Sequence, residues 1–187
     1  MEKENRERVI ILIDGSNFYH STAKKGIKVK FEKLIKELIR DNILIEACYY
    51  VAPLDIEANE EKYWAHQRFI TKLNQIPKFK VILCSLKKLK IKGEYAYFVK
   101  GDDIKMSNKL IIGAIDDLYD TAILVSGDED FIDSIDIARK RYKKKVGNAY
   151  FSKSSSLNLR KSCDFTIRLN KIIDKISSAL PEDHTEH

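Results

Sequence analysis

The sequence contains few glycines, prolines and cysteines: 7, 3 and 3 among 187 residues. This scarcity excludes a collagen-like chain and a linker-rich or low-complexity array, because both depend on glycine and proline. Hydrophobic residues at 44% and aromatic residues at 10% are enough for a packed core and exclude an intrinsically disordered chain. The length predicts a single domain over residues 1–187, ending in a polar tail at 180–187.

Cysteine patterns typical of disulfide frameworks or zinc sites are also absent. The three cysteines, Cys48, Cys84 and Cys163, are odd in number and far apart. This pattern favours free thiols in a reducing compartment, so we expect a cytoplasmic protein. No apolar run approaches the roughly 18 residues that span a bilayer, and the charged N-terminus is not followed by an apolar segment. Neither secretion nor membrane insertion is expected.

Basic residues outnumber acidic ones by 34 to 28, which gives a net charge of +6. Lysine and arginine concentrate in three stretches, 78–92, 139–145 and 153–161. Such stretches are typical of an ordinary solvated surface, but they also suit a polyanionic partner.

Strand and helix patterns alternate along the chain. Apolar or alternating runs predict strands at 9–13, 43–51, 79–84, 95–99, 121–125 and 146–151. Helical spacing predicts helices at 31–39, 56–76, 104–119 and 131–141, with a short turn at 157–161. In the helix at 104–119, four side chains are expected to point inward: Met106, Leu110, Ile111 and Ile115. The residues Lys92-Gly93-Glu94 indicate a hairpin turn. This order predicts an α/β fold, a three-layer sandwich with a mainly parallel central sheet and Rossmann-like topology.

Acidic residues follow two of the predicted strands. Asp14 and Asn17 end the first strand in IDGSN, and SGDEDF at 126–131 follows the strand at 121–125. A third acidic pair, Asp102-Asp103, begins a predicted helix. Because the carboxyl ends of parallel strands share one edge of a sheet, we expect these groups to converge.

Converging carboxylates require a cation. At a separation of about 4 Å and an effective dielectric constant of about 20, each pair repels by about 4 kcal/mol. Oxygen ligands without a neighbouring histidine or cysteine favour Mg²⁺ or Mn²⁺. Each acidic group has an alternative as a helix cap or turn residue, and this holds for Asp14, for Asp102 and Asp103, and for Asp128 and Asp130. The coincidence of all three groups favours a shared site.

Three segments resemble the NYN family of PIN-like nucleases, most closely its LabA-like branch. They are IDGSNF at 13–18, KGDDI at 100–104 and DTAILVSGDEDF at 120–131, with a weaker match in LNLRKSCDFTIRL at 157–169. The resemblance spans roughly residues 8–170. It implies a PIN-like fold and metal-dependent endonuclease activity on single-stranded or structured RNA.

The resemblance also implies roles for single residues. Asp14, Asp103 and Asp128 match the family's metal ligands, and Asp130 adds a fourth catalytic carboxylate. Asn17 and Ser126 match polar residues that orient the ligands, and Asp102 shares the role of Asp103. The expected reaction is attack of a metal-activated water on a phosphodiester, without a covalent enzyme intermediate.

One departure from the family pattern leaves an alternative open. LabA-like members commonly carry another aspartate in the helix after Asp103, where this chain has Ser107-Asn108-Lys109. A lysine there is expected to put a cation beside the carboxylates. The alternative is a weak or inactive PIN-like domain that serves as an RNA-binding or protein-interaction adaptor.

Basic residues near the acidic motifs are candidates for phosphate contacts. The candidates are Lys100, Lys105, Lys109, Lys153, Arg160 and Lys161. The aromatic residues Tyr95, Tyr97 and Phe98 suit base stacking, although alternating aromatics in a strand more often pack in a sheet. The oligomeric state is left open, with a homodimer as one expectation.

Overall fold

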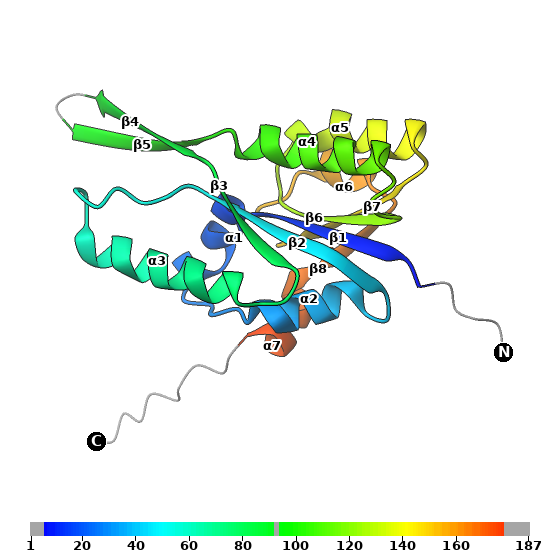
Figure 1. Ribbon diagram of the computed structural model, residues 1–187, viewed down its shortest axis with the longest axis horizontal. Helices are drawn as coiled ribbons and strands as arrows, with labels where there is room; N and C mark the ends of the chain where they lie inside the picture. The colour runs from blue at the N-terminus through cyan, green and yellow to red at the C-terminus, as the bar shows by residue number, and fades with distance from the viewer. Residues whose placement is uncertain (1–5, 92–93, 178–187) are drawn as a thin grey trace, which may run out of the picture.

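The computed structural model describes residues 6–91 and 94–177. Its centre is a six-stranded sheet with the strand order β3-β2-β1-β6-β7-β8, and every strand pairing in it is parallel (Figure 1). The strands are β1 (Arg8–Asp14), β2 (Ile43–Val51), β3 (Phe79–Leu83), β6 (Thr121–Val125), β7 (Lys145–Tyr150) and β8 (Phe165–Arg168). The predicted α/β fold is therefore confirmed.

Helices cover both faces of this sheet, and each face has its own hydrophobic core. One face carries α1 (Gly15–Ser21), α2 (Phe31–Ile39), α3 (Glu60–Asn74) and α7 (Ile173–Ile176), and the other carries α4 (Asp102–Ile115), α5 (Ile132–Asp136) and α6 (Leu157–Ser162). Strand β1 contributes alternately to the two cores: Ile11 and Ile13 face one, Ile10 and Leu12 the other. Burial on both faces explains its continuous apolar run.

Short irregular helices complete the described chain. They are 3-10 helices at Ala23–Lys25, Glu129–Phe131 and Leu169–Ile172 and a π-helical segment at Ile137–Arg141. The helix predicted at 131–141 is thus a continuous helical stretch that changes type along its length. No helix in the described ranges, 6–91 and 94–177, is long and apolar enough to cross a membrane.

Two predicted helices have different boundaries in the structure. Helix α3 starts at Glu60, because the side chain of Asn59 accepts a hydrogen bond from the Lys62 amide at 2.8 Å and caps it. Helix α4 ends at Ile115, whose side chain is 53% exposed and not inward as expected. Tyr119, four residues later, is fully buried in the core instead, and its hydroxyl donates to the Leu110 carbonyl at 2.8 Å.

Strand β8 was not predicted from the sequence. Only four residues long, it pairs with β7, where the ring of Phe165 lies so close to Gly147 that a Cβ there would be 2.3 Å from the ring. Asp164, just before β8, accepts hydrogen bonds from Arg139 Nε at 2.8 Å and from the Val146 amide at 2.8 Å. The polar residue that precedes β8 therefore holds the start of this strand against β7.

We expect Asp164→Ala to destabilise the protein. Burial disfavours the Asp164 carboxylate, but Arg139 and the Val146 amide favour it more and lower its pKa. Loss of these bonds from a partly exposed group should cost about 1–2 kcal/mol at neutral pH. Because a lowered pKa stabilises only above the unfolded value of about 3.9, the deficit should shrink as pH falls through the folded pKa. Urea unfolding at several pH values measures this, and a deficit that grows in acid would contradict it.

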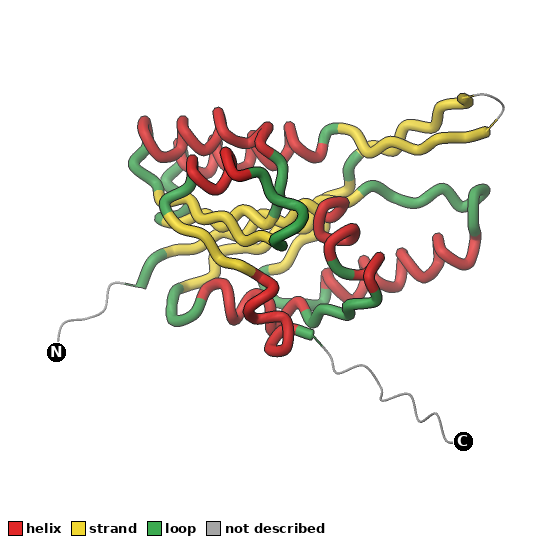
Figure 2. Tube along the Cα trace, turned by 180° about the vertical axis from the view of Figure 1, so that it is seen from behind, coloured by secondary structure: helices red, strands yellow, loops and turns green. Residues whose placement is uncertain are grey.

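The predicted hairpin forms a separate two-stranded sheet. Strands β4 (Ser85–Ile91) and β5 (Glu94–Lys100) pair antiparallel and extend away from the body, as Figures 1 and 2 show from opposite sides. We call this pair of strands the arm. The predicted turn includes residues 92–93, which lie outside the described residues, as does the tail at 180–187.

Candidate metal and nucleic-acid site

Asp14 and Ser126 lie side by side at the carboxyl ends of two adjacent parallel strands. Ile13 pairs with Val125 in the register of β1 and β6. The residues that follow this pair, Asp14 and Ser126, therefore lie at the same edge of the sheet. Asp14 caps α1: its Oδ1 accepts from the Asn17 amide at 2.9 Å, and its Oδ2 accepts from the Ser126 hydroxyl at 2.9 Å. The expected convergence of the two motifs is present.

Gly15 allows the chain to turn directly after Asp14. A Cβ at this position would lie 2.3 Å from the Tyr50 carbonyl oxygen. Only glycine fits such a close approach of backbone to backbone. The residue after the carboxylate is therefore dictated by packing against β2.

The second motif forms a chain of local hydrogen bonds. The Ser126 hydroxyl accepts from the Asp128 amide at 3.2 Å, and Asp128 Oδ1 accepts from the Asp130 amide at 3.0 Å. Asp128 thereby caps the 3-10 helix at Glu129–Phe131. Asp14 and Asp128 both serve as caps, as the alternative interpretation held, and Ser126 links them.

Asp102 and Asp103 form the first turn of α4 and approach the same edge. Gly101 precedes them in the left-handed region, with φ at 83°, and no side chain of the described residues caps this helix. Burial raises the pKa of Asp103 to about 6, with further contributions from the nearby carboxylates of Asp102, Asp14, Asp128 and Asp130. The four aspartates thus lie close enough to disfavour ionisation of Asp103.

Asp14 is a second carboxyl group whose ionisation is disfavoured in the folded protein. Burial raises its pKa, the bonds from Asn17 and Ser126 oppose this, and repulsion from Asp102 and Asp128 adds to it. A cation near these carboxylates would offset the uncompensated negative charge.

The donor chemistry fits Mg²⁺ or Mn²⁺, since the side chains that gather at this edge offer carboxylate and hydroxyl oxygens. Within residues 6–91 and 94–177, however, no three His, Cys, Asp or Glu side chains are grouped closely enough to hold an ion directly. Mg²⁺ usually keeps several waters and takes only one or two carboxylates. The residues therefore fit an ion held by one or two of these aspartates, with waters bridging to the rest.

Asn148 supports this site and was missed by the sequence analysis. It is fully buried in β7, and its Nδ2 donates to the carbonyls of Leu124 at 3.0 Å and Ser126 at 2.8 Å. These bonds hold the end of β6 where Ser126 meets Asp14. The available signal was a single asparagine inside the apolar run VGNAY.

The serine loop at 152–156 packs against the second motif. Ser156 N donates to the Gly127 carbonyl at 2.9 Å, and the Ser156 hydroxyl donates to Glu129 Oε2 at 2.6 Å. The hydroxyls of Ser154 and Ser21 lie 2.8 Å apart. The loop opens at the same end of the sheet, beside a shallow pocket lined by Glu129, Asp130, Ile132, Asp133 and Asn158.

The predicted basic residues have different surroundings. Lys100 is exposed where the arm meets α4, and Lys153 and Lys161 are exposed on the serine loop and α6. Lys105 Nζ donates to the Leu83 carbonyl at 2.6 Å, and the Arg160 guanidinium lies 4.7 Å from the centre of the Tyr150 ring.

Lys109 does not lie beside the site carboxylates, contrary to the expectation. Its ammonium forms an ion pair with Glu46, a buried residue of β2 that also binds Lys80 at 3.0 Å. Glu46 is in register with Ile10, four residues before Asp14, or about 13 Å along the strand. The lysine therefore neutralises a buried glutamate and is not positioned to replace a metal ligand.

Comparisons with known proteins give one family and one fold. The model of the NYN domain matches residues 8–170. A crystal structure of a protein of unknown function from Vibrio parahaemolyticus is similar, with a TM-score of 0.72 and 22% identity over 95% of this chain and 100% of that chain. Among curated proteins, no significant match is found.

Proposed function

Because the chain belongs to the NYN domain family of PIN-like nucleases, we propose that it is a metal-dependent endoribonuclease. The observation that carries this proposal is the meeting of Asp14, Asp103 and Asp128 at one edge of the sheet, where burial and mutual repulsion raise the pKa of Asp14 and Asp103. Acidic side chains held together at such a cost suit a cation-dependent reaction.

In this proposal Asp14, Asp103 and Asp128 would surround Mg²⁺ or Mn²⁺, with one or two of them binding the ion directly and the rest acting through water, and Asp130 supplies a further carboxylate. When bound, the ion lowers the pKa of a water and neutralises charge on the phosphoryl oxygens. Ser126 holds one oxygen of Asp14 and the backbone of Asp128, so it sets the spacing of two ligands. The backbone N–H of Asn17 donates to the other Asp14 oxygen and fixes its position. Asp102 shares the role of its neighbour Asp103.

The basic residues around this edge would bind the RNA backbone. Lys100 and Lys105 flank the start of α4, and Lys153, Arg160 and Lys161 lie on the serine loop and α6. Such contacts are independent of sequence and weaken with salt. Lys109 is a poorer candidate, since Glu46 already neutralises it.

An adaptor that binds RNA or a protein without cutting is the second candidate function. The observation in its favour is the lack of a group of three closely spaced acidic ligands among the described residues. The ion pair of Lys109 with Glu46 removes the other argument for an inactive site. The LabA-like branch, a cytoplasmic location and a homodimer also remain proposals; the location is supported by the free cysteines Cys48, Cys84 and Cys163.

Metal removal tests the two candidates. We expect the protein to cleave labelled single-stranded RNA with millimolar Mg²⁺ or Mn²⁺ and not with excess EDTA. The same ions should raise its melting temperature, because an ion that binds the folded state stabilises it by about 2.7 kcal/mol at a hundredfold excess over Kd. Gel electrophoresis and thermal unfolding measure the two effects. RNA binding without cleavage, and without a thermal shift in either ion, would favour the adaptor.

A further inference from the structure

The arm has two faces with different surroundings. Side chains alternate along a strand and cross-strand partners share a face. The register puts Lys88 opposite Tyr97 and Lys90 opposite Tyr95 on one face, which we call the inner face. On the outer face, the cross-strand pairs are Ser85 with Lys100, Lys87 with Phe98, Leu89 with Ala96, and Ile91 with Glu94.

The inner face braces the arm against the segment at 52–59. Lys88 Nζ lies 2.9 Å from Asp55 and 3.1 Å from Glu57, and the Tyr97 hydroxyl donates to Asp55 at 2.9 Å. Lys88 Nζ is also 4.4 Å from the centre of the Tyr95 ring. Because an isolated hairpin is only marginally stable in water, the bonds to Asp55 and Glu57 help to hold the arm in place, together with the packing of Val99 on the core. They also neutralise Lys88.

Among the described residues, no ion pair or side-chain hydrogen bond braces the outer face, and its apolar side chains are exposed, as Tyr95 is on the inner face. The side chains of Phe98, Leu89 and Ile91 are 41%, 39% and 48% exposed. Lys87 lies directly opposite Phe98, and Lys100 is two residues further along the same strand face. In the described part of the chain, neither lysine takes part in an ion pair. An exposed aromatic ring between two unpaired cations is the combination that binds single-stranded nucleic acid.

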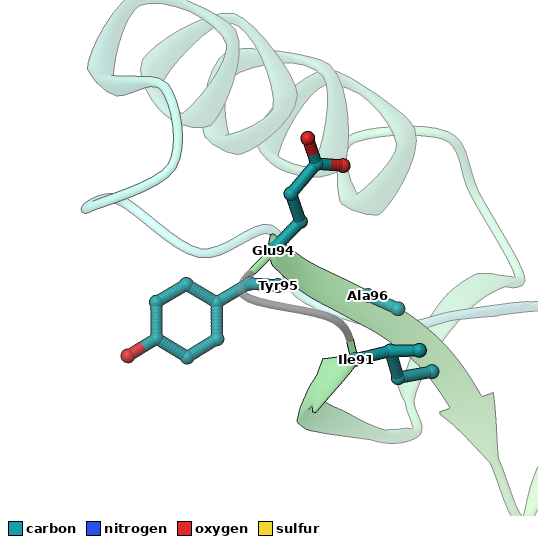
Figure 3. A pocket seen from close by; sticks show the side chains of 4 residues that line it. All are labelled: Ile91, Glu94, Tyr95 and Ala96. Atoms are coloured by element: carbon teal, nitrogen blue, oxygen red, sulfur yellow. The ribbon is translucent and has the colours of Figure 1, made fainter.

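The outer face continues directly into the acidic site. Lys100 ends β5, and after Gly101 the chain enters α4 with Asp102 and Asp103. At the other end of the arm, Glu94 lines a shallow hollow with Ile91, Tyr95 and Ala96, and Figure 3 shows the Tyr95 ring directed away from Ile91 and Ala96. Because the base of the arm adjoins Asp102 and Asp103, it is the part best placed to lead RNA into the site.

We propose that the outer face at the base of the arm binds a single-stranded part of the RNA substrate. One base stacks on Phe98, and the adjoining phosphates contact Lys87 and Lys100. The charge of this face complements a polyanion, and its position leads the strand toward the carboxylates. The inference rests on the proposed function.

Paired variants on the two faces test this inference. Affinity is measured by fluorescence anisotropy with a fluorescein-labelled single-stranded RNA oligonucleotide in EDTA, where cleavage is suppressed. Phe98→Ala should weaken binding about tenfold, since one base loses its stacking partner. Lys87→Ala should reduce the slope of log affinity against log salt by about 0.7, the value for one phosphate contact on a single strand. The matched inner-face variants Tyr95→Ala and Lys90→Ala should change neither quantity.

Other outcomes would contradict different parts of the proposal. Equal losses in Tyr95→Ala and Lys90→Ala would contradict the choice of face. Wild-type affinity in Phe98→Ala and Lys87→Ala, with cleavage intact in the wild type, would overturn the arm proposal alone. Wild-type protein that neither binds nor cleaves RNA would overturn the proposed function as well. A change from dimer to monomer in Phe98→Ala, seen by sedimentation without RNA, would identify the outer face as an interface between copies.

Discussion

Asp14→Asn is expected to abolish metal-dependent RNA cleavage while making the metal-free protein more stable. Asparagine keeps the cap, because its side-chain oxygen can still accept from the Asn17 amide and the Ser126 hydroxyl can rotate to a new partner. The variant loses the negative charge that would hold the ion. Replacing a group that only supports a metal ligand typically lowers metal affinity or activity about 10–100-fold. Replacing a ligand itself should therefore lower the cleavage rate about 100-fold or more.

The gain in stability follows from the direction of the Asp14 pKa. Burial raises the pKa of this carboxyl above its unfolded value, so ionisation at neutral pH opposes folding. Removing the charge should raise the free energy of unfolding by about 1 kcal/mol, as is common when a functional residue is replaced. Urea unfolding without metal measures this gain, and adding Mg²⁺ or Mn²⁺ should stabilise the wild type only.

Asp136→Asn provides a matched control for the loss of one aspartate. Asp136 lies on α5, where it forms a surface ion pair with Lys140 at 2.6 Å. Its replacement should leave cleavage unchanged and alter stability by less than about 0.5 kcal/mol. Full activity in Asp14→Asn would exclude Asp14 as a ligand and assign it only a capping role.

Gly127→Ala is expected to disrupt both the fold and the site. A Cβ at this position would lie 1.4 Å from the Ser154 carbonyl oxygen and 2.9 Å from Cα of Ser155. Because the clash is with backbone, no side-chain rotation relieves it and the serine loop must move. Overpacking of this kind should cost about 3 kcal/mol or more. The displaced loop should also weaken RNA cleavage, since Ser156 no longer binds the Gly127 carbonyl.

Gly26→Ala separates this effect from the ordinary cost of losing a glycine. Gly26 has φ at 78°, but none of the described residues places an atom within 4 Å of the added Cβ. Its replacement should cost only about 1 kcal/mol through the left-handed backbone. Urea unfolding of both variants measures the difference, and equal losses would show that Gly127 is not packed as the structure has it.

Much of the fold followed from local sequence patterns. The uninterrupted apolar run at 9–13 predicted a strand buried on both faces, and β1 divides its side chains between two cores. Helix boundaries were less predictable, because they depend on capping by Asn59 and on the competition between Ile115 and Tyr119 for the core. Strand β8 was missed, since four residues that join a sheet edge carry almost no period of their own.

The sequence by itself determined which residues stand at the strand ends: Asp14 after the first strand and Ser126 to Asp130 after β6. Only the tertiary structure decided what surrounds them. The adjacency of β1 and β6 joins Asp14 to Ser126, Asn148 reaches across from β7, and Lys109 turns to Glu46 and away from the site. The physical reason is that the two kinds of interaction join residues at different separations along the chain. A strand and its terminal residue are set by neighbours in sequence, whereas the partner of a charge depends on strand order and helix position, which follow from packing across the whole sheet.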